Sequence, residues 1–209
     1  MRRIFPRRLY GALLLGLHAA GAAAGVVTVD VRAARGGEGS ALDSVVVFDP
    51  LDAKPPPGRN AFDIDQVKKT FQPHVSVIRT GTVVSFPNSD NIHHEVYSFS
   101  APHPFTREMF GGEPHVTEVF DKPGVLVLGC NIHDSMVAFV LVVDSPYFAK
   151  TPASGRVELT LPPGRYRLRV WNVDLESASG SQLLTVGAEP LALTVDLNRP
   201  RGSPESWPD

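Results

Sequence analysis

Apolar and polar residues alternate in short runs along most of the chain, and this pattern predicts β-strands. In residues 26–31 the side chains of Val27, Val29 and Val31 share one face of an extended chain, while Thr28 and Asp30 point to the other. The same alternation recurs in residues 157–161, 166–170 and 191–197. No stretch shows the period of a long amphipathic helix, so the pattern favours an all-β fold built from β-sandwiches.

Glycine and proline divide these runs and indicate where the chain turns. The chain contains 18 Gly and 19 Pro, and the glycine-rich residues 36–39 separate the first strand from a second apolar run at 44–48. We therefore predict a β-hairpin within residues 25–52. Three consecutive prolines at 55–57 form a stiff linker, which places a domain boundary before residue 60.

The N-terminus has the features of a secretory signal peptide, which we place at residues 1–24. Four arginines lie among the first eight residues, an apolar run follows over residues 9–20, and small residues come next. An uncleaved membrane anchor is the alternative, although the run is shorter than the roughly 20 residues that span a bilayer. We expect a periplasmic protein with no membrane span after signal cleavage.

Charge argues against nucleic acid as a partner. The whole chain has 20 Lys and Arg against 22 Asp and Glu, and loss of the four leader arginines leaves 16 basic and 22 acidic residues, a net charge of −6. Nucleic-acid-binding domains instead present basic surfaces. We therefore expect no nucleic-acid partner.

The only cysteine begins a motif of potential metal ligands between two apolar runs, at 125–128 and 137–143. Cys130 is followed at intervals of three by His133 and Met136. A single cysteine in an exported chain cannot form an internal disulfide, and metal ligation would explain its presence in an oxidising compartment. A thiolate, two imidazoles and a distant methionine sulfur are the donors of a mononuclear blue copper site. An inert buried cysteine is the alternative.

The second imidazole of such a site has to come from another strand, and His93 and His94 are the candidates. Neighbouring side chains of a strand point to opposite faces, so only one of these two can face the metal. The carboxylate of Glu95 would lie close to the site, where it would either orient the ligand or be solvated.

Several motifs around these residues resemble the cupredoxins, the family of plastocyanin and amicyanin. The resemblance rests on Phe86-Pro87-Asn88, His94-Glu95-Val96 and a ligand loop of amicyanin length that begins at Gly129-Cys130. It is closest to the exported cupredoxin-type proteins labelled methylamine utilization proteins. It covers residues 60–145 and implies a Greek-key β-sandwich in which one mononuclear copper ion is held by His94, Cys130, His133 and Met136.

The C-terminal third resembles a second kind of β-sandwich, the transthyretin-like or carboxypeptidase-regulatory-like module. The likeness rests on residues 155–168, in which Leu161-Pro162-Pro163-Gly164 precedes Tyr166. Residues 146–199 hold only three or four predicted strands, few for an independent sandwich. We expect residues 25–52 to complete this module, with the copper domain inserted between its strands; alternatively, they pack on the copper domain. Residues 200–209 are expected to form a flexible tail.

These features predict an electron carrier rather than an enzyme. Four protein ligands leave no position for a substrate, and the chain lacks a phosphate-binding glycine loop, an HExxH motif and a nucleophile elbow. By the family resemblance, a periplasmic redox partner protein would exchange electrons through His133. Copper delivery, or a carbohydrate- or protein-binding module without metal, are the alternatives. A second metal site formed by His103, Met109 and His115 is also open.

Overall fold

The computed structural model describes residues 23–33, 41–58, 60–109, 116–177, 180–200 and 202. This part of the chain forms strands and turns and contains no helix, which confirms the all-β fold class. Accordingly, none of its elements is a helix that could cross a membrane. Residues 1–22 of the predicted signal peptide and most of the predicted tail lie outside the described residues.

Four sheets and two small ribbons contain all the described strands. The strands are β1 (Gly25–Ala33), β2 (Val45–Pro50), β3 (Ala61–Asp63), β4 (Asp65–Val67), β5 (Thr70–Gln72), β6 (Val75–Arg79), β7 (Thr82–Phe86), β8 (His94–Ser98), β9 (Phe105–Met109), β10 (Val116–Phe120), β11 (Gly124–Gly129), β12 (Val137–Val143), β13 (Phe148–Lys150), β14 (Arg156–Leu161), β15 (Gly164–Trp171), β16 (Leu175–Glu176), β17 (Gln182–Val186), β18 (Leu191–Leu197) and β19 (Arg199–Pro200).

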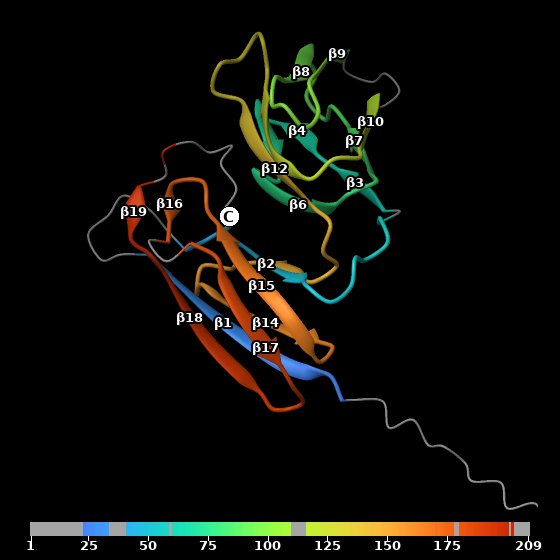
Figure 1. The fold of residues 1–209 in the computed structure, drawn as a ribbon. Helices are drawn as coiled ribbons and strands as arrows, with labels where there is room; N and C mark the ends of the chain where they lie inside the picture. Colours follow the sequence, from blue (N-terminus) through green and yellow to red (C-terminus); the bar gives the residue numbers. More distant parts are fainter. Residues whose placement is uncertain are drawn as a thin grey trace, which may run out of the picture.

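The upper sandwich in Figure 1 packs a three-stranded sheet, in the order β10-β7-β3, against a five-stranded sheet, in the order β6-β12-β11-β8-β9. Its core is filled by inward-facing side chains of both sheets, among them Phe86, Phe120 and Leu128. Cys130 and Met136 belong to the same apolar cluster. The loop that carries them joins β11 to β12 at the end of this sandwich that points away from the lower one (Figure 1).

The lower sandwich combines strands from both ends of the chain. One sheet has the order β14-β1-β18 and the other has the order β13-β2-β15-β17. The core between them includes Val29 of β1, Phe48 of β2 and Leu168 of β15. The strands that precede the upper sandwich in the sequence therefore pair with strands that follow it.

The hairpin predicted within residues 25–52 is wrong, because β1 and β2 lie in different sheets. Both edges of β1 are occupied, by β14 in antiparallel and by β18 in parallel orientation. Both edges of β2 are likewise occupied, by β13 and β15. A glycine-rich segment permits a turn, but the partners that fill the strand edges come from distant parts of the chain.

A third apolar cluster joins the two sandwiches. Side chains of β12 point alternately into the upper core and into this interface, where Phe139, Leu141 and Val143 meet Val45 and Val47 of β2. The other face of β2 lies in the lower core. Strands buried on both faces are nearly continuous apolar runs, which explains why residues 44–48 and 137–143 lack alternation.

Candidate metal centre

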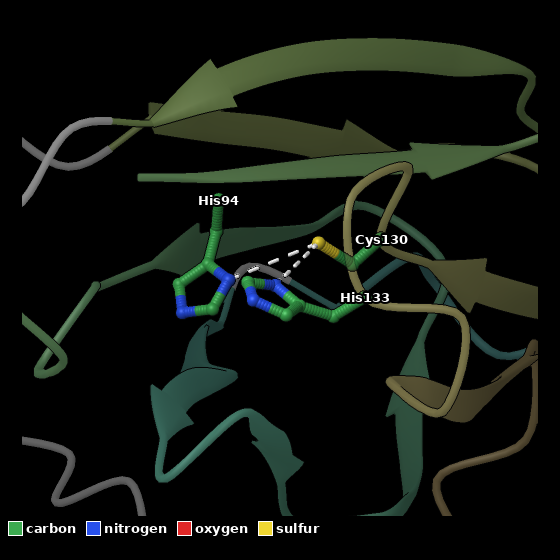
Figure 2. A group of neighbouring side chains, drawn as sticks. All are labelled: His94, Cys130 and His133. Carbon is green, nitrogen blue, oxygen red and sulfur yellow. Dashed lines mark hydrogen bonds between the residues drawn. The ribbon is translucent and has the colours of Figure 1, made fainter. Parts of the chain in front are cut away.

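Three of the four predicted ligands meet at one end of the upper sandwich (Figure 2). His94 is the first residue of β8, while Cys130 and His133 lie in the loop between β11 and β12. The Cys130 Sγ atom is 3.8 Å from His94 Nδ1 and 3.8 Å from His133 Nδ1. The ligand atoms of the three residues lie within 4.8 Å of one another. Both imidazole rings thus turn the same type of nitrogen toward the sulfur.

The local structure of the loop explains why these side chains converge. β11 ends at Gly129, directly before Cys130, and the Met136 amide donates a 2.9 Å hydrogen bond to the His133 carbonyl. This turn folds the loop back toward β12. His94 faces inward because side chains alternate along β8, with Val96 and Ser98 also buried. Two loop residues and one strand residue can therefore share one centre.

The observed separations fit a single bound metal ion. Protein ligands bind zinc at about 2.3 Å through sulfur and about 2.0 Å through nitrogen, so sulfur and nitrogen donors on one ion lie roughly 3.5 to 3.7 Å apart. The 3.8 Å distances from the Cys130 Sγ are close to this spacing. Thiolate and imidazole suit copper, zinc and iron, so the donor types do not by themselves select one metal.

Burial distinguishes the two histidines. His94 is 0% exposed and Cys130 is 2% exposed, whereas His133 is half-buried and forms the part of the centre nearest to solvent. The centroids of the two imidazole rings are 4.9 Å apart, and the ring planes form an angle of 58°. Any bound ion would therefore be shielded from water on the side of His94 and approached through His133.

Asp90, which the sequence reasoning missed, holds His94 in its orientation. The His94 Nε2–H donates to Asp90 Oδ2 at 3.0 Å. An ionised carboxylate only accepts hydrogen bonds, so Nε2 carries a proton, and Nδ1 is the ring nitrogen that faces the Cys130 sulfur. A carboxylate that orients a ligand histidine in this way is common at metal sites. In the sequence, the one indication of this role is that Asp90 lies four residues before His94.

Asp90 is itself held by a tight turn at Lys68 and Lys69. Lys68 and Lys69, between β4 and β5, both have left-handed backbone angles, with φ of 52° and 58°. Their amides donate to Asp90 Oδ1 at 2.6 Å and to Oδ2 at 2.8 Å. The carboxylate therefore links the turn to the buried ligand His94, so two distant parts of the chain position one imidazole.

The surroundings favour the protonation states that metal binding requires. Burial raises the pKa of Asp90, but hydrogen bonds from the Lys69 amide, the His94 side chain and the Lys68 amide outweigh this effect and lower the pKa below its ordinary value. Burial lowers the pKa of His133, and the charges of His94 and Lys69 lower it further, against the opposing effect of Asp90. A neutral imidazole is the form that binds a metal.

The remaining candidates have different environments. Met136 is 1% exposed and packs in the same apolar cluster as Cys130, but its role as the fourth ligand stays a prediction. His93 does not belong to the cluster of three ligands. Glu95 points to the opposite face of β8 from His94, so the carboxylate that orients His94 is that of Asp90.

The second metal site considered from the sequence has no support in the described residues. A ring nitrogen of His103 instead forms a 2.9 Å hydrogen bond with Glu118 Oε2, and the ring packs on Phe105 and Phe120. His115 lies outside the described residues. Across the described ranges, His94, Cys130 and His133 are the one group of three His, Cys, Asp or Glu side chains with this geometry.

Solved structures that resemble this chain include copper proteins and cupredoxins. A copper-containing nitrite reductase from Thermus scotoductus SA-01 is 28% identical, with a TM-score of 0.38, over 40% of this chain and 22% of its own. A purple cupredoxin from Nitrosopumilus maritimus is 22% identical, with a TM-score of 0.35, over 38% of this chain and 97% of its own. A mutant of amicyanin in its reduced state is 20% identical, with a TM-score of 0.36, over 39% of this chain and 81% of its own.

These likenesses are partial and their TM-scores are low, so function has to rest on the geometry of the centre. No protein-family model matches the chain. No curated protein matches it either.

Proposed function

We propose that this protein is a periplasmic mononuclear copper protein that carries single electrons, with His94, Cys130, His133 and Met136 as ligands. The observation that supports it most directly is the convergence of two Nδ1 atoms on one buried thiol, each 3.8 Å from Sγ. When bound, copper would supply reversible one-electron chemistry. We also propose that residues 1–24 are a signal peptide. The copper domain would then be a cupredoxin of the exported type labelled methylamine utilization protein.

The chain's own residues would keep the centre rigid and dry. Asp90 fixes the imidazole of His94, and the apolar cluster around Cys130 and Met136 excludes water from the buried side. A ligand loop fixed between two paired strands limits the structural change that accompanies a change of charge at the metal. His133 would be the contact with the redox partner. With the protein ligands filling the centre, we propose no catalytic role.

The domain organisation belongs to the same proposal. Residues 60–145 would form the copper domain, and residues 25–52 and 146–199 a transthyretin-like module into which it is inserted. The sheet orders that join β1 to β14 and β18, and β2 to β13 and β15, are consistent with this division.

Copper delivery is the second candidate, and the half-buried His133 favours it, because a ligand near solvent allows the metal to exchange. The two functions use the same ligands. Fast loss of Cu(I) to a weak chelator supports delivery, whereas retained copper with reversible electrochemistry supports electron transfer.

The direct test is to add Cu(II) to the purified metal-free protein and to record its visible absorption and paramagnetic-resonance spectra. We expect an intense thiolate-to-copper charge-transfer band that is absent from Cys130→Ser. His74→Ala is the matched control, because His74 is hydrogen-bonded to the Val137 carbonyl and does not belong to the cluster of ligands. A wild-type protein that stays colourless contradicts the proposal.

A further inference from the structure

A hollow of about 540 Å³ opens where the edges of both sheets of the upper sandwich meet the lower sandwich. Residues that line it include Ala61 and Phe62 of β3, Val77 and Arg79 of β6, Thr82 of β7 and Phe148 of β13. Its volume lies within the range of roughly 300 to 1,000 Å³ that is usual for ligand sites. Because β13 belongs to the lower sandwich, the hollow lies at the opposite end of the upper sandwich from the ligand loop (Figure 1).

The strand β6 has one open edge at the hollow, because it pairs with β12 alone. The His74 carbonyl and the Thr80 amide, one residue outside either end of β6, bond to β12. Backbone groups alternate between the two edges of a strand, so those of the odd-numbered residues point away from β12. The Val75 carbonyl accordingly accepts from Lys150 Nζ at 3.0 Å. The amide and carbonyl of Val77 bond to no described group.

The strand β3 is likewise open at the hollow, because it pairs with β7 alone. The Val83 amide donates to the Asn60 carbonyl at 2.9 Å, and the Ile64 amide donates to the Ser85 carbonyl at 2.9 Å. By the same alternation, the amide and carbonyl of Ala61 point away from β7. Two sheets therefore present open backbone groups at one hollow. Extended peptides bind to such edges by adding a strand.

Arg79 brings a positive charge to the hollow. Its Nη2 donates to the Pro56 carbonyl and, at 3.5 Å, to the Asp144 carbonyl. The Asp144 carboxylate instead accepts from Thr80 Oγ1 at 2.6 Å. The Nε–H of Arg79 is buried and meets no acceptor, and the guanidinium forms no ion pair, within the described part of the chain. A buried donor of this kind favours a ligand that supplies an acceptor.

The opposite side of the same sandwich is closed by its own charges. There β9 and β10 are the outer strands of the two sheets. Arg107 of β9 forms a 2.6 Å ion pair with Glu118 of β10, which is also bonded to His103 at 2.9 Å. The chain thus supplies both cation and carboxylate on that side. Between β3 and β6 the described residues supply the cation alone, so the matching carboxylate would come from another molecule.

We propose that this hollow binds an extended segment of a partner protein, which adds a strand to the open edge of β6 and brings an aspartate or glutamate to Arg79. The side chains of Val77 and Arg79 share one face of β6, two residues apart. Cross-strand neighbours have the same spacing, so the segment would carry an apolar residue two positions from its acid. The partly buried rings of Phe62 and Phe148 would receive the apolar side chain.

A segment of a different protein fits the hollow better than a second copy of this chain joined through the same edge. β6 has the sequence Val75-Ser76-Val77-Ile78-Arg79, which contains no carboxylate for the Arg79 of the other copy. Two such edges would bring two cations and no anion. The hollow is also distant from the ligand loop, so a bound segment would leave His133 accessible (Figure 1).

Random peptides displayed on phage, selected on the immobilised protein, provide the probe. We expect the selected peptides to carry Asp or Glu two positions from an apolar residue. The tightest of them, made synthetically, should shift or broaden the amide signals of Ala61 and Val77 in the ¹⁵N-labelled protein. It should bind about tenfold more weakly to Arg79→Gln, which loses a charge-assisted contact. Arg167→Gln is the matched control, because it removes the same charge from an exposed position of β15, and it should bind as the wild type does.

Val77→Pro tests the backbone pairing separately from the charge. The Val77 amide points away from β12, so proline removes the donor at the open edge without removing a hydrogen bond of the sheet. The variant should keep the amide spectrum of the wild type outside β6 and should lose most of its affinity for the peptide.

Any of the following results would overturn the proposal. The selection yields no binding peptide, or the selected peptide binds Arg79→Gln as tightly as the wild type. Benzoate binds as tightly as the peptide, which would indicate a site for small carboxylates. The protein forms a dimer that Val77→Pro abolishes, which would assign the edge to a second copy. None of these measurements involves copper, so their outcome is independent of the proposed electron-carrier function.

Discussion

At the scale of single residues, Asp90 is the side chain on which the geometry of the candidate centre most depends beyond the ligands themselves. It accepts hydrogen bonds from two backbone amides of the Lys68–Lys69 turn and from the His94 imidazole. Removing the carboxylate would free both the turn and the ring. The tautomer of His94 would then no longer be fixed with Nδ1 toward Cys130.

We therefore predict that Asp90→Ala binds copper roughly 10- to 100-fold more weakly than the wild type, as is usual when the partner of a ligand histidine is removed. Competition with a chelator of known affinity measures this change. Asp134→Asn is the control, because Asp134 is an exposed carboxylate of the ligand loop itself. Equal affinities for Asp90→Ala and the wild type would show that Asp90 does not position His94.

A second residue-scale prediction concerns Asp52, which follows β2 and accepts hydrogen bonds from the Arg165 guanidinium and amide. These contacts lower the pKa of Asp52, against the opposing effect of burial. A carboxyl with a lowered folded-state pKa stabilises the protein above its unfolded-state pKa of about 3.9. That contribution is lost as the pH falls through the folded-state pKa.

Asp52→Asn should therefore be slightly less stable than the wild type at neutral pH, and the difference should disappear in acid below the lowered pKa. The effect is small because the pair is exposed to solvent. Urea-denaturation midpoints measured from neutral to acidic pH provide the test. A difference between the two proteins that is independent of pH would mean that the charge of Asp52 is not responsible.

The ligands and the residues that support them differ in how far the sequence reveals them. Cys130 and His133 are recognisable because their spacing lies within one loop, and structure brings them within 3.8 Å of each other. Because neighbouring side chains of a strand point to opposite faces, the sequence indicates that only one of His93 and His94 can be a ligand. In the structure it is His94 that lies near the Cys130 sulfur. Asp90 could not be identified in this way, because its role depends on where the distant Lys68–Lys69 turn folds.

At the scale of elements, contact between β8 and β11 determines where the ligand loop begins. Gly129 is the last residue of β11, and its Cα lies opposite Tyr97 of β8. The Tyr97 ring occupies the space that a side chain at position 129 would need. A glycine is therefore required at this position for a close approach rather than for an unusual backbone angle.

Gly129→Ala should destabilise the protein by about 1 to 3 kcal/mol, the usual cost of overpacking. Gly187→Ala is the matched control, because an added Cβ there meets no atom within 4 Å. In the background of Tyr97→Ala, the Gly129→Ala substitution should cost much less, since the clash is gone. Denaturation of the wild type, the single variants Gly129→Ala and Tyr97→Ala and their double variant tests this, and additive costs would rule out the ring as the cause.

The elements also show where local pattern is insufficient. Alternation in residues 26–31 predicted a half-buried strand, and the burial of β1 alternates as expected. The predicted pairing with the next strand was wrong, because β1 lies between β14 and β18. Alternation specifies which face of a strand is buried, but it carries no information about which strand lies at each edge.

At the scale of the whole molecule, the two sandwiches share a buried apolar interface. Trp171 of β15 is 0% exposed and packs against Phe139 of β12, with ring centroids 5.8 Å apart. Phe139 lies on the strand that follows the ligand loop. Because this interface is apolar, the two halves should unfold together rather than as separate domains.

Trp171→Ala should lower the free energy of unfolding by about 3 to 5 kcal/mol. Calorimetry should give one transition for the wild type, and the variant should melt at a lower temperature. Leu183→Ala, at an exposed position of β17, should change the stability by less than about 0.5 kcal/mol. Two separate transitions in the wild type, with only one affected by Trp171→Ala, would show that the interface does not couple the sandwiches.

The sequence by itself determined the all-β character of this protein and the chemical types of the donors, because alternation and ligand spacing are local properties of the chain. Tertiary structure alone decided that β1 pairs with β18, that the Lys68–Lys69 turn holds Asp90 against His94, and that β2 and β12 are buried on both faces. Each of these depends on segments far apart in the sequence. Their contacts form only when the sheets pack, since the energy of burial depends on every surface that meets there.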